Sequence, residues 1–203
     1  MTTPTRKKRY VDVLSQRLSV VHCAIEALFQ RHNAAAILRS CDAMGVHNVH
    51  LAGTNPKRAT PGAARGTQQW LNMTQYPSIE SAIENIHKQD LDLWVADLSP
   101  NGLPPEEVPL DRPICIWLGA ELEGVHPEAK AAANGVITIP MRGFTESLNV
   151  SVAAALTLRT IAERARKHWG SDGLLPTDTQ ARILSDWLQR DDDMAKRMRR
   201  RTE

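Results

Sequence analysis

Residues 139–156, IPMRGFTESLNVSVAAAL, decide the fold of this chain. A β-branched run at 135–141 leads into a loop that contains Gly143, and the loop turns into an Ala- and Leu-rich segment. We predict a strand over 135–141 and a helix over 147–169, with Ser147 as the N-cap. The first amides of a helix have no partner inside it, so they face whatever the loop encloses. The stretch predicts a binding site, although a serine-capped loop without a ligand has the same local pattern.

Composition limits the class of protein. The chain has 203 residues, of which 42% are hydrophobic and 24% charged, as expected for one substantial globular core. We find no apolar run as long as a membrane span, and the basic start MTTPTRKKRY lacks the apolar segment of a secretory signal. Three cysteines at scattered positions (Cys23, Cys41 and Cys115) predict a reducing, cytoplasmic setting and no structural zinc.

The net charge of +2 hides an uneven distribution. Nine of the 25 basic residues lie at the two ends, which leaves 16 basic against 22 acidic residues in 11–195, a balance of −6. Two basic ends on an acidic body are typical of arms that bind a polyanion, but terminal basic runs also solubilise chain ends. The basic residues in question are Arg6, Lys7, Lys8, Arg9, Lys196, Arg197, Arg199, Arg200 and Arg201.

Strand-like and helical patterns alternate along the chain. This alternation predicts an α/β fold with a mainly parallel sheet flanked by helices, with Asn33 capping one helix and Gly45 ending it. We expect loops over 54–67 and 99–113, a linker over 170–176, and a last helix over 177–201 outside the core. The strands are expected at 18–25, 46–52, 91–98, 114–118 and 135–141, and the other helices at 2–17, 33–44, 78–89 and 127–133.

The common catalytic motifs are missing. The sequence holds no G-x-G-x-x-G after a strand, no Walker-type loop, no H-E-x-x-H or paired-cysteine metal site, and no G-x-S-x-G. Three segments nevertheless contain polar residues that the strand and helix patterns do not explain. They are HNAAAILR, with Asn33 and Arg39; LGAELEG, with Glu121 after a strand; and residues 139–156. Taken singly, Arg39 reads as a surface residue whose stem covers apolar neighbours, and Glu121 as part of a solvated turn.

Together the three segments resemble one family. The patterns N-x5-R, G-x-E-x-x-G and I-P-M-x-G-x-x-x-SLNVS-x-A, in this order, are similar to the motifs of the SpoU branch of the SPOUT methyltransferases. The phrase RHNAAAILRSCDAMGV and the basic ends resemble the TrmH type within that branch. The resemblance implies a knotted catalytic domain over 18–169, a helical basic extension over 1–17 and another over 170–203.

The resemblance also implies an activity. The enzymes concerned transfer a methyl group from S-adenosylmethionine to a ribose 2′-hydroxyl of tRNA, here guanosine 18 in the D-loop. They act as homodimers, with the site at the subunit interface and a trefoil knot near the end of the catalytic domain. Ribosomal RNA or the tRNA anticodon loop is the alternative substrate, because the motifs do not separate these enzymes. A non-catalytic RNA-binding protein is a further alternative, which the intact motif residues disfavour.

The resemblance also assigns the family's residue roles to the matching motif positions of this sequence. The resemblance makes Arg39 the catalytic arginine, oriented together with the cofactor loops by Asn33, Glu121, Ser147 and Asn149. An arginine stays protonated, so we favour a clamp on the neighbouring phosphate, while a role as base stays open. No metal is implied, and Ala96 lacks the hydroxyl that many relatives have there. Six residues would contact the cofactor, namely Ala96, Gly119, Ile139, Met141, Ser147 and Leu148; the basic ends would contact tRNA phosphates.

Overall fold

The computed structural model describes residues 2–26, 31–53, 66–120 and 124–202. The chain divides into two compact units. The larger unit is Leu18–Gly173, and the smaller unit combines Met1–Arg17 with Leu174–Glu203.

A six-stranded sheet forms the centre of the larger unit, and every pairing in it is parallel. The order is β3-β2-β1-β5-β4-β6. Residues of the central strand β5 are all buried, which explains why its sequence ICIWL is continuously apolar. The predicted parallel α/β fold is confirmed. The strand bounds are β1 Leu18–Glu26, β2 Val46–Ala52, β3 Asn72–Gln75, β4 Asp92–Ala96, β5 Ile114–Leu118 and β6 Gly135–Ile137.

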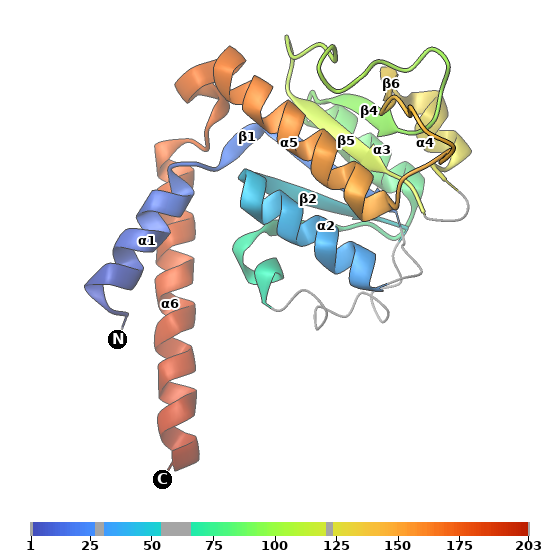
Figure 1. Cartoon of the computed structure of the whole chain (residues 1–203). Coiled ribbons are helices and arrows are strands. Elements are labelled where there is room, and N and C mark those ends of the chain that lie inside the picture. The colour runs from blue at the N-terminus through green and yellow to red at the C-terminus, as the bar shows by residue number, and fades with distance from the viewer. Residues whose placement is uncertain (1, 27–30, 54–65, 121–123, 203) are drawn as a thin grey trace. The chain divides into compact units, whose positions relative to one another are not determined.

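Helices cover both faces of this sheet (Figure 1). Helices α2 (Arg31–Met44) and α5 (Val150–Trp169) pack against each other on one face. Helices α3 (Ile79–Lys88) and α4 (Pro127–Ala132) cover the other, where Ile83 and Ile86 of α3 join a core with Leu93, Val95 and Trp117 from the strands. Ser78 and Ser81 form a capping box at the start of α3, so the amphipathic helix predicted there is confirmed.

Two predicted caps are wrong. Asn33 does not cap α2, because the helix begins at Arg31 and Asn33 lies inside its first turn. Ser147 does not cap α5, because Asn149 does so: its Oδ1 accepts the backbone N–H of Ser151 at 2.9 Å. Both Ser and Asn are good caps, and the tertiary path of the chain selects between them. The predicted helix end at Gly45 is confirmed, since its φ of 77° suits glycine.

Other differences concern short polar segments. Strand β3 was not predicted, because its sequence NMTQ is polar and only four residues long. Strand β6 ends at Ile137 rather than at residue 141, so Ile139 and Met141 belong to the following loop. The predicted linker begins with a 3-10 helix, η3 (Gly170–Gly173), and another, η2 (Thr67–Trp70), precedes β3. Residues 54–65 of the predicted loop lie outside the described residues.

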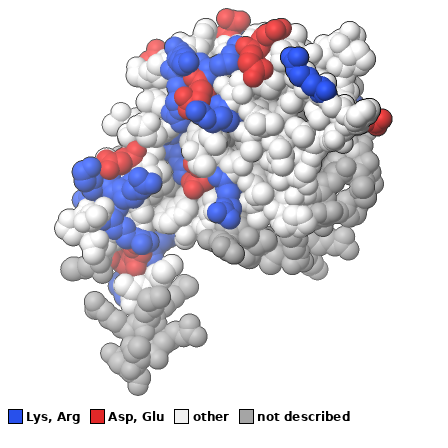
Figure 2. All heavy atoms as spheres, viewed as in Figure 1, with Lys and Arg blue, Asp and Glu red and all other residues white. Residues whose placement is uncertain are grey.

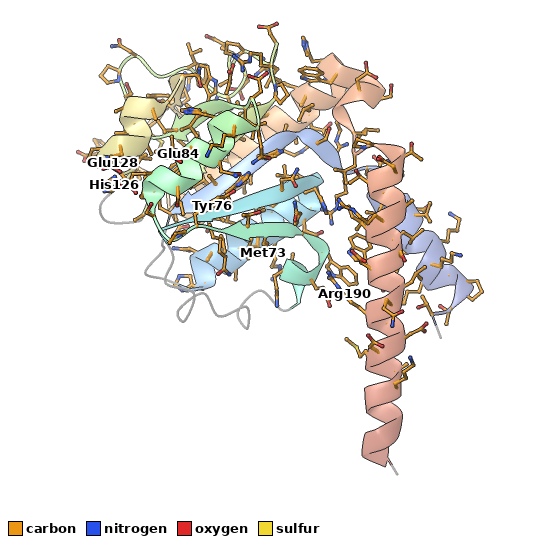
Figure 3. All side chains as sticks on the ribbon, turned by 180° about the vertical axis from the view of Figure 1, so that it is seen from behind. Met73, Tyr76, Glu84, His126, Glu128 and Arg190 are labelled. Carbon is orange, nitrogen blue, oxygen red and sulfur yellow. The ribbon has the colours of Figure 1, made fainter. Side chains whose placement is uncertain are left out.

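A chain of buried polar side chains crosses the sheet on the α3 side. His22 Nδ1 lies 2.9 Å from His50 Nε2, and His50 Nδ1 lies 3.0 Å from the Tyr76 hydroxyl, which donates to Asn85 Oδ1 at 2.7 Å. Tyr76 is seen from this side in Figure 3. Burial lowers the pKa of His22 to about 3 and that of His50 to about 4, so both rings are neutral at pH 7. These groups satisfy one another inside the core.

The smaller unit pairs helices α1 (Pro4–Leu14) and α6 (Thr177–Thr202). Thr3 caps α1 and a proline begins it, while the Tyr10 and Trp187 rings meet edge to face at 5.4 Å. The Asp191 carboxylate accepts hydrogen bonds from Arg6 Nε at 2.6 Å and from the Tyr10 hydroxyl at 2.8 Å. Although partial burial opposes it, these hydrogen bonds hold the pKa of Asp191 below its ordinary value. Within the described residues, no helix has the length and apolar character needed to cross a membrane.

Candidate active site

The carboxyl ends of four strands meet at one edge of the sheet. Leu118 at the end of β5 pairs with Ile25 of β1 and Ala96 of β4, and Ala96 pairs with Ile137 of β6. The loops that follow β4, β5 and β6 therefore leave the sheet side by side. In open parallel sheets this edge is where ligands bind.

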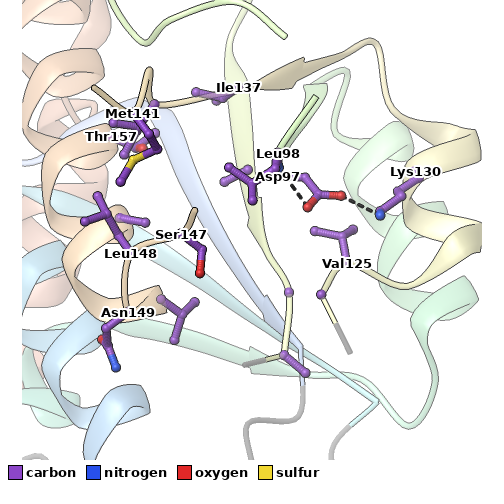
Figure 4. A pocket seen from close by; sticks show the side chains of 17 residues that line it. Asp97, Leu98, Val125, Lys130, Ile137, Met141, Ser147, Leu148, Asn149 and Thr157 are labelled. Atoms are coloured by element: carbon purple, nitrogen blue, oxygen red, sulfur yellow. Dashed lines mark hydrogen bonds and ion pairs between the residues drawn. The ribbon is translucent and has the colours of Figure 1, made fainter. Parts of the chain in front are cut away.

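A cavity of about 610 Å³ opens between these loops and the start of α5 (Figure 4). Its volume lies in the range of small-molecule sites, about 300–1,000 Å³. All six residues predicted to contact a cofactor line it: Ala96, Gly119, Ile139, Met141, Ser147 and Leu148. Tertiary structure thus brings together residues that lie up to 52 positions apart in the sequence.

Several lining residues were missed by sequence reasoning. They include Asp97 and Leu98 after β4, Lys130 on α4, and Thr157 on α5. Asp97 directly follows Ala96 and could have been found from that position. No local sequence signal marks Lys130 or Thr157, because each lies on a helix whose face toward the cavity is decided by packing.

Two features show that the cavity wall is closely built. The Thr157 side chain is buried, lines the cavity, and its Oγ1 has no hydrogen-bond partner among the described residues. Leaving such a group without a partner costs about 1–3 kcal/mol of stability. At Gly119, a Cβ would collide with the backbone of Gly124 and Val125, so only glycine allows the loop after β5 to fold back on itself.

A buried carboxylate anchors this loop. Oε1 of Glu26, the last residue of β1, accepts the Trp117 indole N–H at 2.6 Å and the His126 backbone N–H at 2.8 Å. His126 in turn caps α4. The end of β1, the core of β5 and the start of α4 are thereby fixed relative to one another.

The predicted catalytic residues are only partly assembled. Asn149 lines the cavity and its Nδ2 donates to Asn33 Oδ1 at 3.4 Å, which links α5 to α2. Asn33 is buried, and its own Nδ2 has no partner among the described residues. Ser147 lines the cavity and is exposed. Arg39 is exposed on α2 and is not among the described residues that line the cavity, and Glu121 lies outside the described residues.

Comparison with known proteins identifies the family. Residues 20–159 match the SpoU rRNA Methylase family. The chain belongs to the SpoU methylase family. It is 36% identical over 186 residues to the tRNA (guanosine(18)-2′-O)-methyltransferase of Escherichia coli K12, a match that covers 89% of this chain and 81% of the relative. The resemblance inferred from the three motifs is therefore confirmed.

Solved structures agree with this assignment. The crystal structure of the Aquifex aeolicus TrmH/SpoU tRNA modifying enzyme has a TM-score of 0.81 and 29% identity, and the match covers 92% of this chain and 96% of that one. The SpoU methyltransferase AviRb from Streptomyces viridochromogenes, solved in complex with AdoMet, has a TM-score of 0.66 at 21% identity, over 77% of this chain and 64% of that one. That second likeness shows that the fold is shared.

Glycine substitutions test the described geometry of the SpoU methylase cavity. Gly119→Ala should lower the free energy of unfolding by about 1–3 kcal/mol, because the new Cβ overlaps the Gly124 backbone. Gly143→Ala is the matched control, since a Cβ there meets nothing within 4 Å, and it should leave stability unchanged. Urea unfolding of the two variants measures this. Equal stability of both variants would mean that the loop after β5 does not pass as closely as described.

Proposed function

We propose that this protein transfers the methyl group of S-adenosylmethionine to the ribose 2′-hydroxyl of guanosine 18 in tRNA. The main support is that the six residues predicted to contact the cofactor, which come from the loops after three strands, line one cavity at the carboxyl edge of the sheet. The relative from Escherichia coli, which shares 36% of its residues over most of both chains, carries this activity in its name.

The cavity fits the proposed cofactor. Its wall carries the apolar side chains of Ile139, Met141 and Leu148, which suits a flat heteroaromatic base. Ala96 supplies no hydroxyl, so any polar contact on that strand end must come from the backbone or from Asp97. The trefoil knot that the family resemblance implies stays a prediction.

We propose that the residues of the site promote methyl transfer by positioning the two reactants and by placing a positive charge near the acceptor hydroxyl. The bound cofactor supplies an electrophilic methyl group, and the 2′-hydroxyl must approach it in line. Asn149, held by its cap on α5 and by Asn33, would orient the loop of Ser147 against the acceptor ribose. Arg39 would bind the adjacent phosphate, and its positive charge would favour loss of the hydroxyl proton.

We propose a homodimer, because Arg39 does not line the cavity of its own chain among the described residues. Val152 and Leu156, which lie one turn apart on α5 and are 47% and 48% exposed, form an apolar strip that offers a contact surface. Phe144, in the loop before α5, is also completely exposed. Exposed apolar groups gathered in one region mark protein contacts more often than isolated ones do. A second copy seated on this strip could carry its Arg39 to the cavity.

We propose the smaller unit as the main tRNA-binding surface. Lys7, Lys8 and Arg9 are exposed on α1, and Figure 2 shows the basic side chains gathered there. Arg6, also predicted to bind tRNA, makes a two-bond contact with Asp191 and is better described as holding α1 against α6. Lys196 is exposed near the end of α6, where the side chains of 197–201 lie outside the described part. We place the reaction in the cytoplasm, where tRNA is found and where the three free cysteines would stay reduced.

Methylation of total RNA with labelled cofactor, followed by mapping of the modified nucleotide, tests the function. Label should appear on the ribose of guanosine 18. Arg39→Ala should reduce transfer about 10²–10³-fold while cofactor binding and stability stay unchanged, and Arg39→Lys should restore little, because lysine lacks the planar fork. Arg112→Ala, which removes an exposed arginine paired with Asp92, is the control. Label on ribosomal RNA or in the anticodon loop would reject the proposed substrate, and an active Arg39→Ala would reject the clamp.

Sedimentation tests the homodimer. Leu156→Glu places a charge in the apolar strip on α5 and should convert a dimer into monomers at micromolar concentration. Val11→Glu, which alters an equally exposed apolar residue on α1, should leave the dimer intact. A monomeric wild-type protein would contradict the proposal directly.

Salt-dependent tRNA binding tests the basic surface. Combined alanine substitutions of Lys7, Lys8 and Arg9 should weaken binding to all tRNAs alike and reduce the slope of log affinity against log salt by about 0.9 per lost phosphate contact. Single-turnover transfer at saturating tRNA should change much less. Substitution is preferable to truncation, because removing residues 1–9 would also remove the Thr3 cap and the Arg6–Asp191 contact. An unchanged salt slope would make these residues solubilising groups only.

A further inference from the structure

An ion pair forms one side of the cavity. Asp97 follows β4 and Lys130 lies on α4, and Lys130 Nζ lies 2.5 Å from Asp97 Oδ2 (Figure 4). The other oxygen of Asp97 accepts the backbone N–H of Leu98 at 2.9 Å, which fixes the carboxylate. The Lys130 side chain is 47% exposed, so its ammonium can still donate to a further acceptor.

The rest of the cavity wall carries no charged side chain where the structure describes it. Among the described residues that line it, Asp97 and Lys130 are the only ones with ionised side chains. The pair lies across the cavity from Met141 and Thr157, as Figure 4 shows. The described wall therefore has one charged side and one uncharged, mainly apolar side.

The proposed cofactor has the same asymmetry. One end of S-adenosylmethionine is an uncharged adenine, and the other carries an α-ammonium and an α-carboxylate. We propose that Asp97 and Lys130 form the subsite for this amino-acid end, with Lys130 donating to the α-carboxylate and Asp97 accepting from the α-ammonium. This subsite rests on the proposed function. It determines that the amino-acid end of the cofactor, and not the adenine, lies next to the ion pair.

Electrostatics favours this direction of binding. With the amino-acid end at the pair, each of the four charged groups lies next to one of opposite sign, and charge-assisted hydrogen bonds form between them. The reversed direction would place two charged groups against Met141 and its apolar neighbours, where burial without partners is costly. In the proposed direction the adenine meets the mainly apolar side, next to Met141.

The pair itself contributes little to folding. Both side chains are partly exposed, 47% for Lys130 and 23% for Asp97, and solvent-exposed ion pairs are worth only about 0–1 kcal/mol. Removing the charge of Lys130 should therefore leave the fold intact. This separates a ligand-binding role from a structural one.

Two ligands that differ only at the amino-acid end test the subsite by calorimetry. S-adenosylhomocysteine carries that end, and 5′-methylthioadenosine lacks it. Lys130→Met should weaken binding of S-adenosylhomocysteine about tenfold and leave binding of methylthioadenosine within about twofold, while Lys130→Arg should keep most of the affinity. Lys88→Met is the matched control, because it removes a lysine from the exposed Lys88–Glu84 pair on α3 and should affect neither ligand.

A second measurement needs no variant. Raising the salt concentration should weaken binding of S-adenosylhomocysteine to the wild-type protein more than that of methylthioadenosine, because partly exposed charges are screened. Equal losses for both ligands in Lys130→Met, or no loss for either, would overturn the subsite and leave the proposed function standing. A wild-type protein that binds neither ligand would overturn the proposed cofactor and the subsite together.

Discussion

The parallel register of β1, β5, β4 and β6 is the constraint on which the site depends. Because Ile25, Leu118, Ala96 and Ile137 are aligned across the sheet, every strand of this group ends at the same edge. The connecting loops must then start side by side, and together with the beginning of α5 they enclose the cavity. A shift of one residue in β5 would exchange the side chains of its two covered faces and move Trp117 out of the core under α3, so the packing of Cys115 and Trp117 there helps to hold the register.

Some buried polar groups have partners inside the protein and others have none within the described part of the chain. In the core, His22, His50 and Tyr76 satisfy one another and stay neutral, and Glu26 accepts two donors that tie β1 to the loop after β5. Among the described residues, buried side-chain atoms without a partner include Thr157 Oγ1 at the cavity, and also Asn33 Nδ2 and Trp94 Nε1, whose residues do not line it. Each such group costs stability, about 1–3 kcal/mol.

Charge is arranged on two scales. Within the smaller unit, Arg6 and Asp191 are 185 positions apart yet form a two-bond contact, so one of the basic residues near the N-terminus serves the packing of α1 and α6 while its neighbours remain exposed. Within the larger unit, the Asp97–Lys130 ion pair places charge on one side of the described cavity wall. The exposed basic side chains on α1 suit a polyanion such as tRNA. The ion pair in the cavity suits a zwitterion such as the amino-acid end of the proposed cofactor.

The sequence by itself determined the alternation of strands and helices, the burial of β5, the helix end at Gly45 and the six cofactor-site candidates that line the cavity. These features depend on local residue patterns or on the residues of the motifs, and both can be read directly from the sequence. Tertiary structure decided the start of α5 at Asn149, the short polar strand β3, the partner of Arg6, and the approach of Lys130 and Thr157 to the cavity. An edge strand, an ion pair and a cavity wall need partners that lie far away along the chain. The cap of α5 is a local bond to Ser151, but the side chain that makes it also donates to Asn33 on α2.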